Sequence, residues 1–240
     1  MTQDNDNLPR PRLLVYMPGR EFLLPYFERQ FPHHEVVTDL DAADIRSAVM
    51  VSSTDIYDVT DGQLHDENTP LRTDSADASA ERRFADACRR LSLEPLVLRC
   101  AEIVATGMDG FAMRLVRGMA RMTMFKIADN DARISLVHGV DVARAADCLL
   151  DKGVSGTFNL TDGTETPLNE LLDALSVRLS DKRVYTIKPR WARWLYGKTY
   201  YTQLTRTLTF SNDKISTIIS FTPNKVTKYL TSHVYDESSL

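Results

Sequence analysis

The sequence is poor in the features that mark membrane, metal-binding and nucleic-acid-binding proteins. No apolar run approaches the roughly 18 residues that a membrane-spanning helix needs, and no signal peptide is visible. The net charge of −4 gives no reason to expect nucleic acid or a membrane surface as a partner. The three cysteines stand far apart, without metal or redox spacing, and are expected to be buried free thiols. These absences predict a cytoplasmic protein without a metal site.

Length and composition place the chain among ordinary globular proteins. Its 240 residues are enough for one α/β domain with a smaller C-terminal lobe, and 43% hydrophobic residues supply a substantial core. The first expected elements are a strand over 12–17, a helix over 21–30 and a second strand over 34–39. This β-α-β order is the opening of a dinucleotide-binding fold.

One stretch, residues 48–57, has the pattern of a strand that leads to a binding site. Mostly apolar, β-favouring residues run directly into a polar cluster that contains Ser52, Ser53 and Thr54. In open α/β sheets, ligands lie beyond the carboxyl ends of the parallel strands. We therefore expect these three hydroxyl groups to project to where a substrate binds.

Residues 51–57 and 66–71 together resemble the extended short-chain dehydrogenase/reductase family, which includes NAD-dependent sugar-nucleotide epimerases and dehydratases. In that family a strand ends in Ser-Ser, Val-Tyr-Gly follows, and a Glu-Asn-x-Pro loop comes next. The segments 93–100 and 134–145 are similar to two further stretches of the family. The resemblance implies an α/β protein with a Rossmann-like, doubly wound parallel sheet and a small C-terminal α+β substrate lobe.

The resemblance also implies a chemistry and a site. The chemistry is hydride transfer at a sugar carbon, with NAD or NADP as the cofactor. Ser53 falls on the family's catalytic Ser/Thr position, four residues before Tyr57. The residues expected to contact the substrate are Ser52, Thr54, Tyr57 and Arg99.

The chain is expected to form a core and a lobe that interleave. We predict a disordered lead-in over 1–10, a Rossmann-like core over 11–132, a substrate-type lobe over 133–235 and a frayed tail over 236–240. The lead-in is polar, as disordered termini are. Within the lobe, residues 156–172 form a strand, a turn and a helix, an arrangement similar to the family's substrate lobe.

The family's phosphate-binding loop, which has glycines at three positions, is missing. On this chain the three positions fall on Met17, Arg20 and Leu23, whose side chains are expected to crowd the path of a pyrophosphate. Gly19 is the nearby glycine and stands out of register, so Gly19 and Arg20 are the candidate cofactor contacts in this turn. The Arg20 guanidinium either offers hydrogen bonds to a phosphate or is a solvated surface group.

Two more features of the family's cofactor site, the acidic ribose contact and the strands that follow it, are ambiguous or missing. Asp39 lies at the end of the second strand, where an acidic residue takes a ribose hydroxyl, but the same residue suits a turn or a helix cap. Only residues 40–47 separate that strand from the Ser-Ser strand. Because the family has two further strand–helix units there, we expect a shortened sheet.

The family's Tyr-x-x-x-Lys pair, which supplies a general acid/base and the cation that lowers its pKa, has no counterpart here. No tyrosine occurs between Tyr57 and Tyr185. The two positions fall on Thr73 and Asp77 in one alignment, and on Asp77 and Glu81 in another. A carboxylate at the lysine position raises the pKa of a neighbouring hydroxyl instead of lowering it.

Residues 190–206 are basic and aromatic, and two interpretations are open. The aromatic side chains either stack bases or enter a membrane interface, or they cover the substrate lobe or a partner surface. Because the whole chain is acidic, we expect the second, with no nucleic acid and no membrane as partner. The sheet edge left by the missing strands favours a homo-oligomer or a complex with an active homologue.

The sequence supports three functional hypotheses. The favoured one is a catalytically impaired protein of this family, which acts as a sensor of an unknown small-molecule ligand or as a partner protein. The alternative is an active NAD(P)-dependent sugar-nucleotide epimerase/dehydratase or a related oxidoreductase, although Ser53 is all that is left of the catalytic set. A third is different chemistry in the same crevice, with Asp55, Asp77 or His138 as base.

Overall fold

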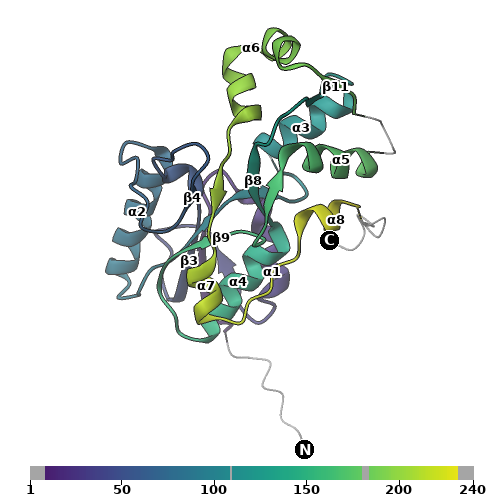
Figure 1. Cartoon of the computed structure of the whole chain (residues 1–240). Coiled ribbons are helices and arrows are strands. Elements are labelled where there is room, and N and C mark those ends of the chain that lie inside the picture. The colour runs from purple at the N-terminus through teal and green to yellow at the C-terminus, as the bar shows by residue number, and fades with distance from the viewer. Residues whose placement is uncertain (1–8, 109, 180–183, 232–240) are drawn as a thin grey trace, which may run out of the picture.

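The centre of the molecule is a parallel sheet of five strands in the order β2-β1-β3-β5-β9 (Figure 1). The computed structural model describes residues 9–108, 110–179 and 184–231. Each neighbouring pair in this sheet is parallel. The strands are β1 (Arg12–Tyr16), β2 (Glu35–Val37), β3 (Ile45–Ser53), β5 (Leu96–Cys100) and β9 (Gly156–Leu160).

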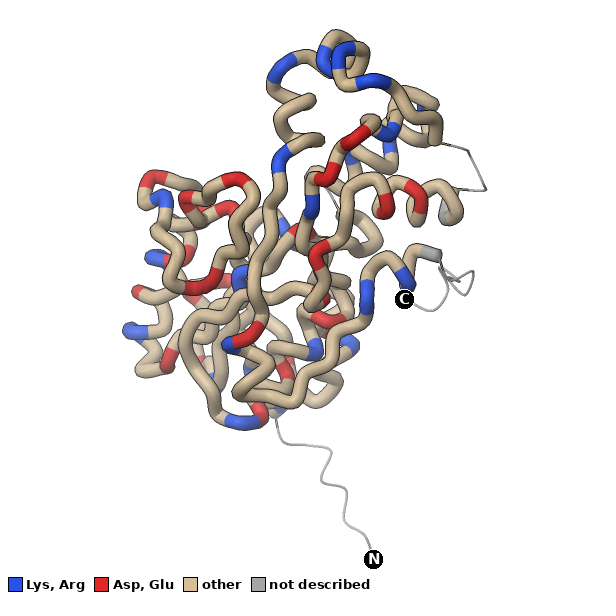
Figure 2. The backbone as a smooth tube through the Cα atoms, viewed as in Figure 1, with Lys and Arg blue, Asp and Glu red and all other residues tan. Residues whose placement is uncertain are grey.

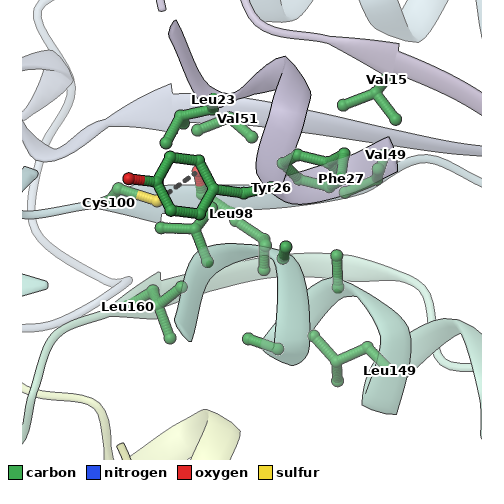
Figure 3. Close-up of a cluster of buried hydrophobic side chains, with 14 of the residues drawn as sticks. Val15, Leu23, Tyr26, Phe27, Val49, Val51, Leu98, Cys100, Leu149 and Leu160 are labelled. Carbon is green, nitrogen blue, oxygen red and sulfur yellow. Dashed lines mark hydrogen bonds between the residues drawn. The ribbon is translucent and has the colours of Figure 1, made fainter. Parts of the chain in front are cut away.

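Helices cover both faces of this sheet because successive strand residues are apolar on both sides. Val15 packs on one face with Phe27 of α1 and Leu149 of α4 (Figure 3). Leu14 points to the other face and packs with Phe84 of α2. The predicted Rossmann-like, doubly wound fold is therefore confirmed. The helices of the core are α1 (Leu24–Gln30), α2 (Ala76–Arg90), α4 (Gly139–Asp151) and α7 (Asp213–Ile218).

The connection between β2 and the Ser-Ser strand β3 is short, as predicted. Residues 38–44 connect β2 to β3 through turns and contain neither helix nor strand. β2 itself is 3 residues long and has one neighbour, β1. The core thus ends where the resemblance expected two more strand–helix units.

A second, smaller lobe has its own apolar core, which includes Leu115, Leu171 and Leu204. Its main sheet has the order β10-β8-β6, and β11 pairs with β7. This lobe contains segments from both the predicted core (11–132) and the predicted lobe (133–235): β6 pairs with β8, and α3 packs with α5. Its elements are β6 (Glu102–Val104), α3 (Phe111–Ala120), β7 (Lys126–Ile127), β8 (Arg133–His138), β10 (Glu165–Pro167), α5 (Leu168–Arg178), β11 (Thr186–Ile187), α6 (Pro189–Thr205) and α8 (Val226–Thr231).

Two further connections join the lobes. β4 (Leu64–His65) pairs with β12 (Thr209–Phe210). Asp141, at the start of α4, is fully buried and accepts a hydrogen bond from the Asn224 backbone N–H at 2.8 Å. A buried carboxylate with such partners fixes the chain before α8 against the core.

The cysteines differ from one another in exposure. Cys88 and Cys100 are buried free thiols, as predicted, and burial raises their pKa to about 11 and about 12. The prediction was wrong for Cys148, which lies on the exposed side of α4. Among the described helices, none combines the length and apolar character of a membrane span. Most of the predicted lead-in and the predicted tail lie outside the described residues.

Candidate functional site

The Ser-Ser strand ends in a short 3-10 helix, Thr54–Ile56. The Ser53 hydroxyl oxygen accepts a hydrogen bond from the Asp55 backbone N–H at 3.0 Å and so caps this helix. Ser52 is fully buried, and its hydroxyl donates to Glu81 of α2 at 2.7 Å. Ser52 therefore lies beneath the end of the strand, whereas Ser53 is partly exposed and uses its oxygen as the helix cap.

A buried network of side chains continues from Glu81 beneath the crevice. The Arg99 guanidinium donates to both carboxylate oxygens of Glu81, at 2.9 and 2.7 Å. It also donates to the Tyr57 hydroxyl at 3.1 Å, and that hydroxyl donates to the Asn159 side-chain oxygen at 2.6 Å. The network links α2, β5 and β9 through groups that are buried and hydrogen-bonded.

The network also sets the protonation of its members. Burial acts to lower the pKa of Arg99, but the hydrogen bonds with Glu81 and Tyr57 outweigh it and raise that pKa above its ordinary value. Burial raises the pKa of Tyr57, although the neighbouring Arg99 works in the opposite direction. Tyr57 consequently keeps its proton at neutral pH, so it can donate a hydrogen bond but does not act as a base.

The turn after β1 is organised by its own side chains. Met17 and Leu23 are buried in the core, so of the three expected obstacles only Arg20 reaches the crevice. Gly19 has a φ of +73°, a conformation that favours glycine. Its backbone N–H donates to the Glu21 carboxylate at 3.0 Å. The N–H group that could serve a phosphate at this helix start is thus already bound to a carboxylate.

An ion pair joins this turn to α2. Nη2 of Arg20 lies 3.1 Å from Oδ1 of Asp77, and the two side chains are 18% and 20% exposed. Arg20 occupies the second of the three glycine positions in the family's phosphate-binding loop. Asp77 occupies the lysine position of the family's Tyr-x-x-x-Lys pair in one alignment and the tyrosine position in the other. The chain has no lysine before Lys126, so α2 offers no ammonium group. A salt bridge stands where the resemblance expects the cofactor-binding groups.

These residues do not fit a dinucleotide. The Glu21 carboxylate at the helix N-terminus repels a pyrophosphate, and the charge of Arg20 is neutralised by Asp77. Asp39, the expected ribose contact, accepts the Asp41 backbone N–H at 3.0 Å and stabilises its own turn. Gly19, Arg20 and Asp39 therefore all have partners within the chain.

A cavity of about 480 Å³ lies between the loop that follows the 3-10 helix and the second lobe. Thr54 and Tyr57, two of the predicted substrate contacts, line it, whereas Ser52 and Arg99 lie in the network below. Asp55 is also at its wall. Its far side is formed by α3, β8 and the second half of α6.

Four arginines line this cavity, and the sequence analysis did not single out any of them as a ligand contact. None of the four makes an ion pair with a carboxylate within the described ranges 9–108, 110–179 and 184–231. Each guanidinium has several N–H donors, and the recorded acceptors are neutral oxygens. Three carboxyl groups, those of Asp55, Asp58 and Glu102, line the same cavity, so the four guanidinium groups leave a small excess of positive charge, which favours an anionic ligand. The four arginines are Arg72, Arg114, Arg133 and Arg206.

Glu102 adds a titratable group to the cavity wall. Its carboxylate accepts the Ala112 backbone N–H at 2.7 Å near the start of α3. Burial is the main cause that raises the pKa of Glu102 to about 7; neighbouring Asp55 acts in the same direction, and the Ala112 hydrogen bond and Arg114 act in the opposite direction. A carboxyl group with this pKa is about half protonated at neutral pH, which limits its repulsion of an anion.

The third hypothesis finds little support in the placement of its bases. His138 is buried, accepts the Val140 backbone N–H at 3.2 Å and packs on Tyr229, with ring centroids 3.8 Å apart. Burial lowers the pKa of His138 to about 4. Asp77 forms an ion pair with Arg20. Of the three candidate bases, Asp55 is the one that lines the cavity. In the part of the chain that the structure describes, no cluster of metal-ligating side chains was found.

No family model and no curated protein matches the sequence. Solved structures with the same fold do exist. Human epimerase family protein SDR39U1 (isoform 2), with NADPH, is 12% identical with a TM-score of 0.66 over 92% of this chain and 98% of that chain. UDP-N-acetylglucosamine 4-epimerase from Bacillus cereus is 13% identical with a TM-score of 0.65 over 92% and 97%. MoeE5, in complex with UDP-glucuronic acid and NAD, is 16% identical with a TM-score of 0.66 over 91% and 96%.

These likenesses establish the fold. The chain has the Rossmann-like architecture of NAD-dependent epimerase/dehydratase proteins, as the resemblance in its sequence implied. It is 240 residues long, and the short connection between β2 and β3 is a specific place where the fold is reduced.

Proposed function

We propose that this protein binds a phosphorylated small molecule of the nucleotide-sugar class in the arginine-lined cavity and acts as a sensor of that ligand, without hydride transfer. One contrast carries the proposal. Four arginines of the cavity form no ion pair with any carboxylate of the described residues, whereas Arg20 and Asp77, at the expected cofactor site, neutralise each other.

The chemistry argues against turnover. Hydride transfer at a sugar carbon needs a group that takes and returns the hydroxyl proton at neutral pH. Asp77 falls on the tyrosine position or the lysine position of the family's pair, depending on the alignment, and forms an ion pair with Arg20. Glu81, one helical turn later, forms an ion pair with Arg99. The Ser53 hydroxyl can orient a carbonyl oxygen, but it cannot shuttle the proton alone. Loss of the acid/base group lowers a rate by a factor of about 10² to 10⁴.

The cavity suits a nucleotide sugar in charge and shape. A diphosphate presents oxygens that planar guanidinium groups bind in pairs. Phe111 and Phe210 offer flat apolar surfaces to a sugar or base, and Thr202 and Gln203 offer polar groups. A solved structure of the same fold, MoeE5, is in complex with such a ligand, UDP-glucuronic acid, together with NAD. These features support the class of ligand and not a particular sugar.

Calorimetric titration with UDP-N-acetylglucosamine, alongside NADH and NADPH, tests the proposal. We expect saturable heat at micromolar nucleotide sugar. With NADH or NADPH we expect no energy transfer from Trp191 or Trp194 to the nicotinamide and no thermal shift. Arg89→Gln, which removes an exposed arginine far from the cavity, serves as the matched control for arginine variants.

The alternative hypothesis gives a different pattern. An active NAD(P)-dependent epimerase or dehydratase would show saturable energy transfer at micromolar cofactor and would convert the nucleotide sugar. Binding of cofactor with turnover overturns the proposal in favour of that enzyme. Absence of heat with a panel of nucleotide sugars and nucleoside diphosphates overturns the ligand class itself.

A further inference from the structure

Large apolar side chains are exposed mainly at one end of the molecule, around the first half of α6 (Figure 1). Trp194 is 79% exposed and Trp191 is 55% exposed, which is unusual for so large an aromatic side chain. Contiguous apolar exposure of this kind marks an interaction site. We call the following five residues the aromatic patch: Met122, Tyr185, Trp191, Trp194 and Leu195.

The patch is held in place by the lobe beneath it. Trp191, Trp194 and Leu195 follow the i, i+3, i+4 spacing of one helix face, and Ala192 on the opposite face is fully buried. The Tyr196 hydroxyl accepts the Phe125 backbone N–H at 2.8 Å, which ties α6 to the turn that carries the methionine of the patch. The lobe thus presents the two indoles as a fixed surface.

Basic side chains surround the aromatic patch. No Asp or Glu occurs anywhere from residue 182 to residue 212, although the whole chain carries a net charge of −4. Figure 2 shows Lys and Arg along α6 and neither Asp nor Glu on it. The basic residues of α6 and its start are Lys188, Arg190, Arg193 and Lys198.

We propose that the aromatic patch docks on the surface of an anionic lipid bilayer. Trp191, Trp194 and Leu195 would enter the headgroup and upper acyl region, where amphipathic indoles are most stable. The surrounding Lys and Arg side chains would bind acidic headgroups. The protein lies on the membrane and does not cross it, since α6 has 17 residues and is interrupted at Gly197, with a φ of +70°.

The composition of the patch favours lipid over other occupants. A single-stranded nucleic acid needs a basic groove with stacking platforms, whereas here two tryptophans meet at 88° beside leucine and methionine. A second copy of this chain is a poorer occupant. If two copies met through the same patch, the basic residues around one patch would face the basic residues around the other. The expectation of no membrane partner came from the charge of the whole chain, which averages over this local surface.

The proposal is independent of ligand binding in the cavity, because none of the five patch residues lines it. Vesicle flotation of the full chain tests it, with vesicles of 70:30 phosphatidylcholine and phosphatidylserine (about this ratio) against pure phosphatidylcholine. We expect the protein to float with the acidic vesicles, with a blue shift of tryptophan emission, and to be released by salt.

Two variants and two controls sharpen this experiment. Trp191→Ser with Trp194→Ser should weaken vesicle partition by at least about tenfold, because two interfacial anchors are lost. Arg190→Gln with Arg193→Gln should abolish the preference for the acidic lipid. Leu64→Ser removes an apolar side chain that is 56% exposed outside the patch, and Arg89→Gln with Arg90→Gln removes exposed charge; both should float normally. Thermal unfolding of each variant checks its fold.

Several results would overturn the proposal. One is absence of flotation with acidic vesicles for a folded protein, and another is flotation that the tryptophan variant leaves unchanged. Gel-shift binding of a 20-mer of single-stranded RNA (about this length) without flotation would assign the patch to nucleic acid instead. A dimer in light scattering that the tryptophan variant dissociates, again without flotation, would assign it to a second copy.

Discussion

At the turn after β1 the guanidinium of Arg20 is paired with Asp77, whereas four guanidinium groups around the cavity have no carboxylate partner among the described residues. Both regions border the crevice at the carboxyl ends of the parallel strands. One is closed by its own side chains, and the other surrounds about 480 Å³ of space with four arginines and three carboxyl groups. Under the proposed function, this fold has lost its cofactor-binding half and kept its ligand-binding half.

The electrostatic reason is that a charge buried away from water needs a partner within the chain, whereas an exposed charge is hydrated until a ligand binds. Asp77 and Glu81 each have an arginine, so that half of the crevice is satisfied without a cofactor. The arginines of the cavity are satisfied only in part by neutral oxygens. Experiments can distinguish the two regions. Substitutions in the ion pairs of Asp77 and Glu81 should change the free energy of unfolding, and substitutions of the cavity arginines should change ligand affinity.

The largest effect is expected from Glu81→Gln. It leaves the Arg99 charge, which is 7% exposed, without its carboxylate. Removal of one partner from a buried ion pair costs about 3–5 kcal/mol of unfolding free energy. Urea denaturation measures this loss, and Glu94→Gln, an exposed glutamate, is the control. A loss below about 1 kcal/mol, the usual worth of a surface pair, would show that the network is not structural.

The next effect concerns the cavity. Arg114→Gln, or Arg133→Gln, removes a charged donor to a phosphate, and such a hydrogen bond contributes about 1.5–3 kcal/mol, or roughly 10- to 100-fold in affinity. The unfolding free energy should hardly change, because both side chains are exposed in the ligand-free protein. Calorimetry with UDP-N-acetylglucosamine measures the affinity. If these variants bound the nucleotide sugar with the same affinity as Arg89→Gln, Arg114 and Arg133 would not be ligand contacts.

A smaller effect is expected from pH through Glu102. Its pKa in the folded chain is raised to about 7, above the ordinary value of 4.5, so the folded state favours the protonated form. The corresponding contribution to stability is present below pH 4.5 and is lost as pH rises through 7. The carboxylate that forms above pH 7 repels phosphates, so affinity for UDP-N-acetylglucosamine should fall several-fold across that pH.

Glu102→Gln isolates this titration. The variant should bind with an affinity that is nearly flat across neutral pH, because the phosphates of a nucleotide sugar do not titrate there. Glu94→Gln should retain the pH dependence of the native chain. Persistence of the full dependence in the Glu102 variant would assign the titration to another group.

The smallest effect is expected from Ser53→Ala. The hydroxyl caps the 3-10 helix through Asp55, and loss of such a cap costs about 1 kcal/mol. Binding of the nucleotide sugar should change little, because Ser53 does not line the cavity. Thermal unfolding and calorimetry measure the two quantities. A large loss of affinity with unchanged stability would show that the hydroxyl contacts the ligand.

Much of the fold could be predicted because its signals are local. The apolar runs of β1, β3 and β5 are read directly from the sequence, and the short connection over 38–44 follows from counting residues between strands. The absence of glycines, tyrosine and lysine at the family's positions is also a property of the sequence alone. Cys148 was misjudged because a helical pattern does not say which face meets solvent.

The candidate site could be predicted only in part. Thr54 and Tyr57, which follow directly from the strand pattern, line the cavity, and their role as substrate contacts stays a prediction. The cavity arginines come from four separate parts of the chain and belong to no common motif, although Arg206 lies within the aromatic and basic segment. Arg99 and Ser52 were expected at the ligand and lie instead in the buried network.

The sequence by itself determined the order of strands and helices, the shortened sheet and the loss of the family's cofactor motifs, since these depend on neighbours along the chain. The tertiary structure decided which charges meet. Arg20 and Asp77 are 57 residues apart, and Tyr57 and Asn159 are 102 apart. Contacts at such separations depend on how the lobes pack, because hydrogen bonds and ion pairs act over a few ångströms in space.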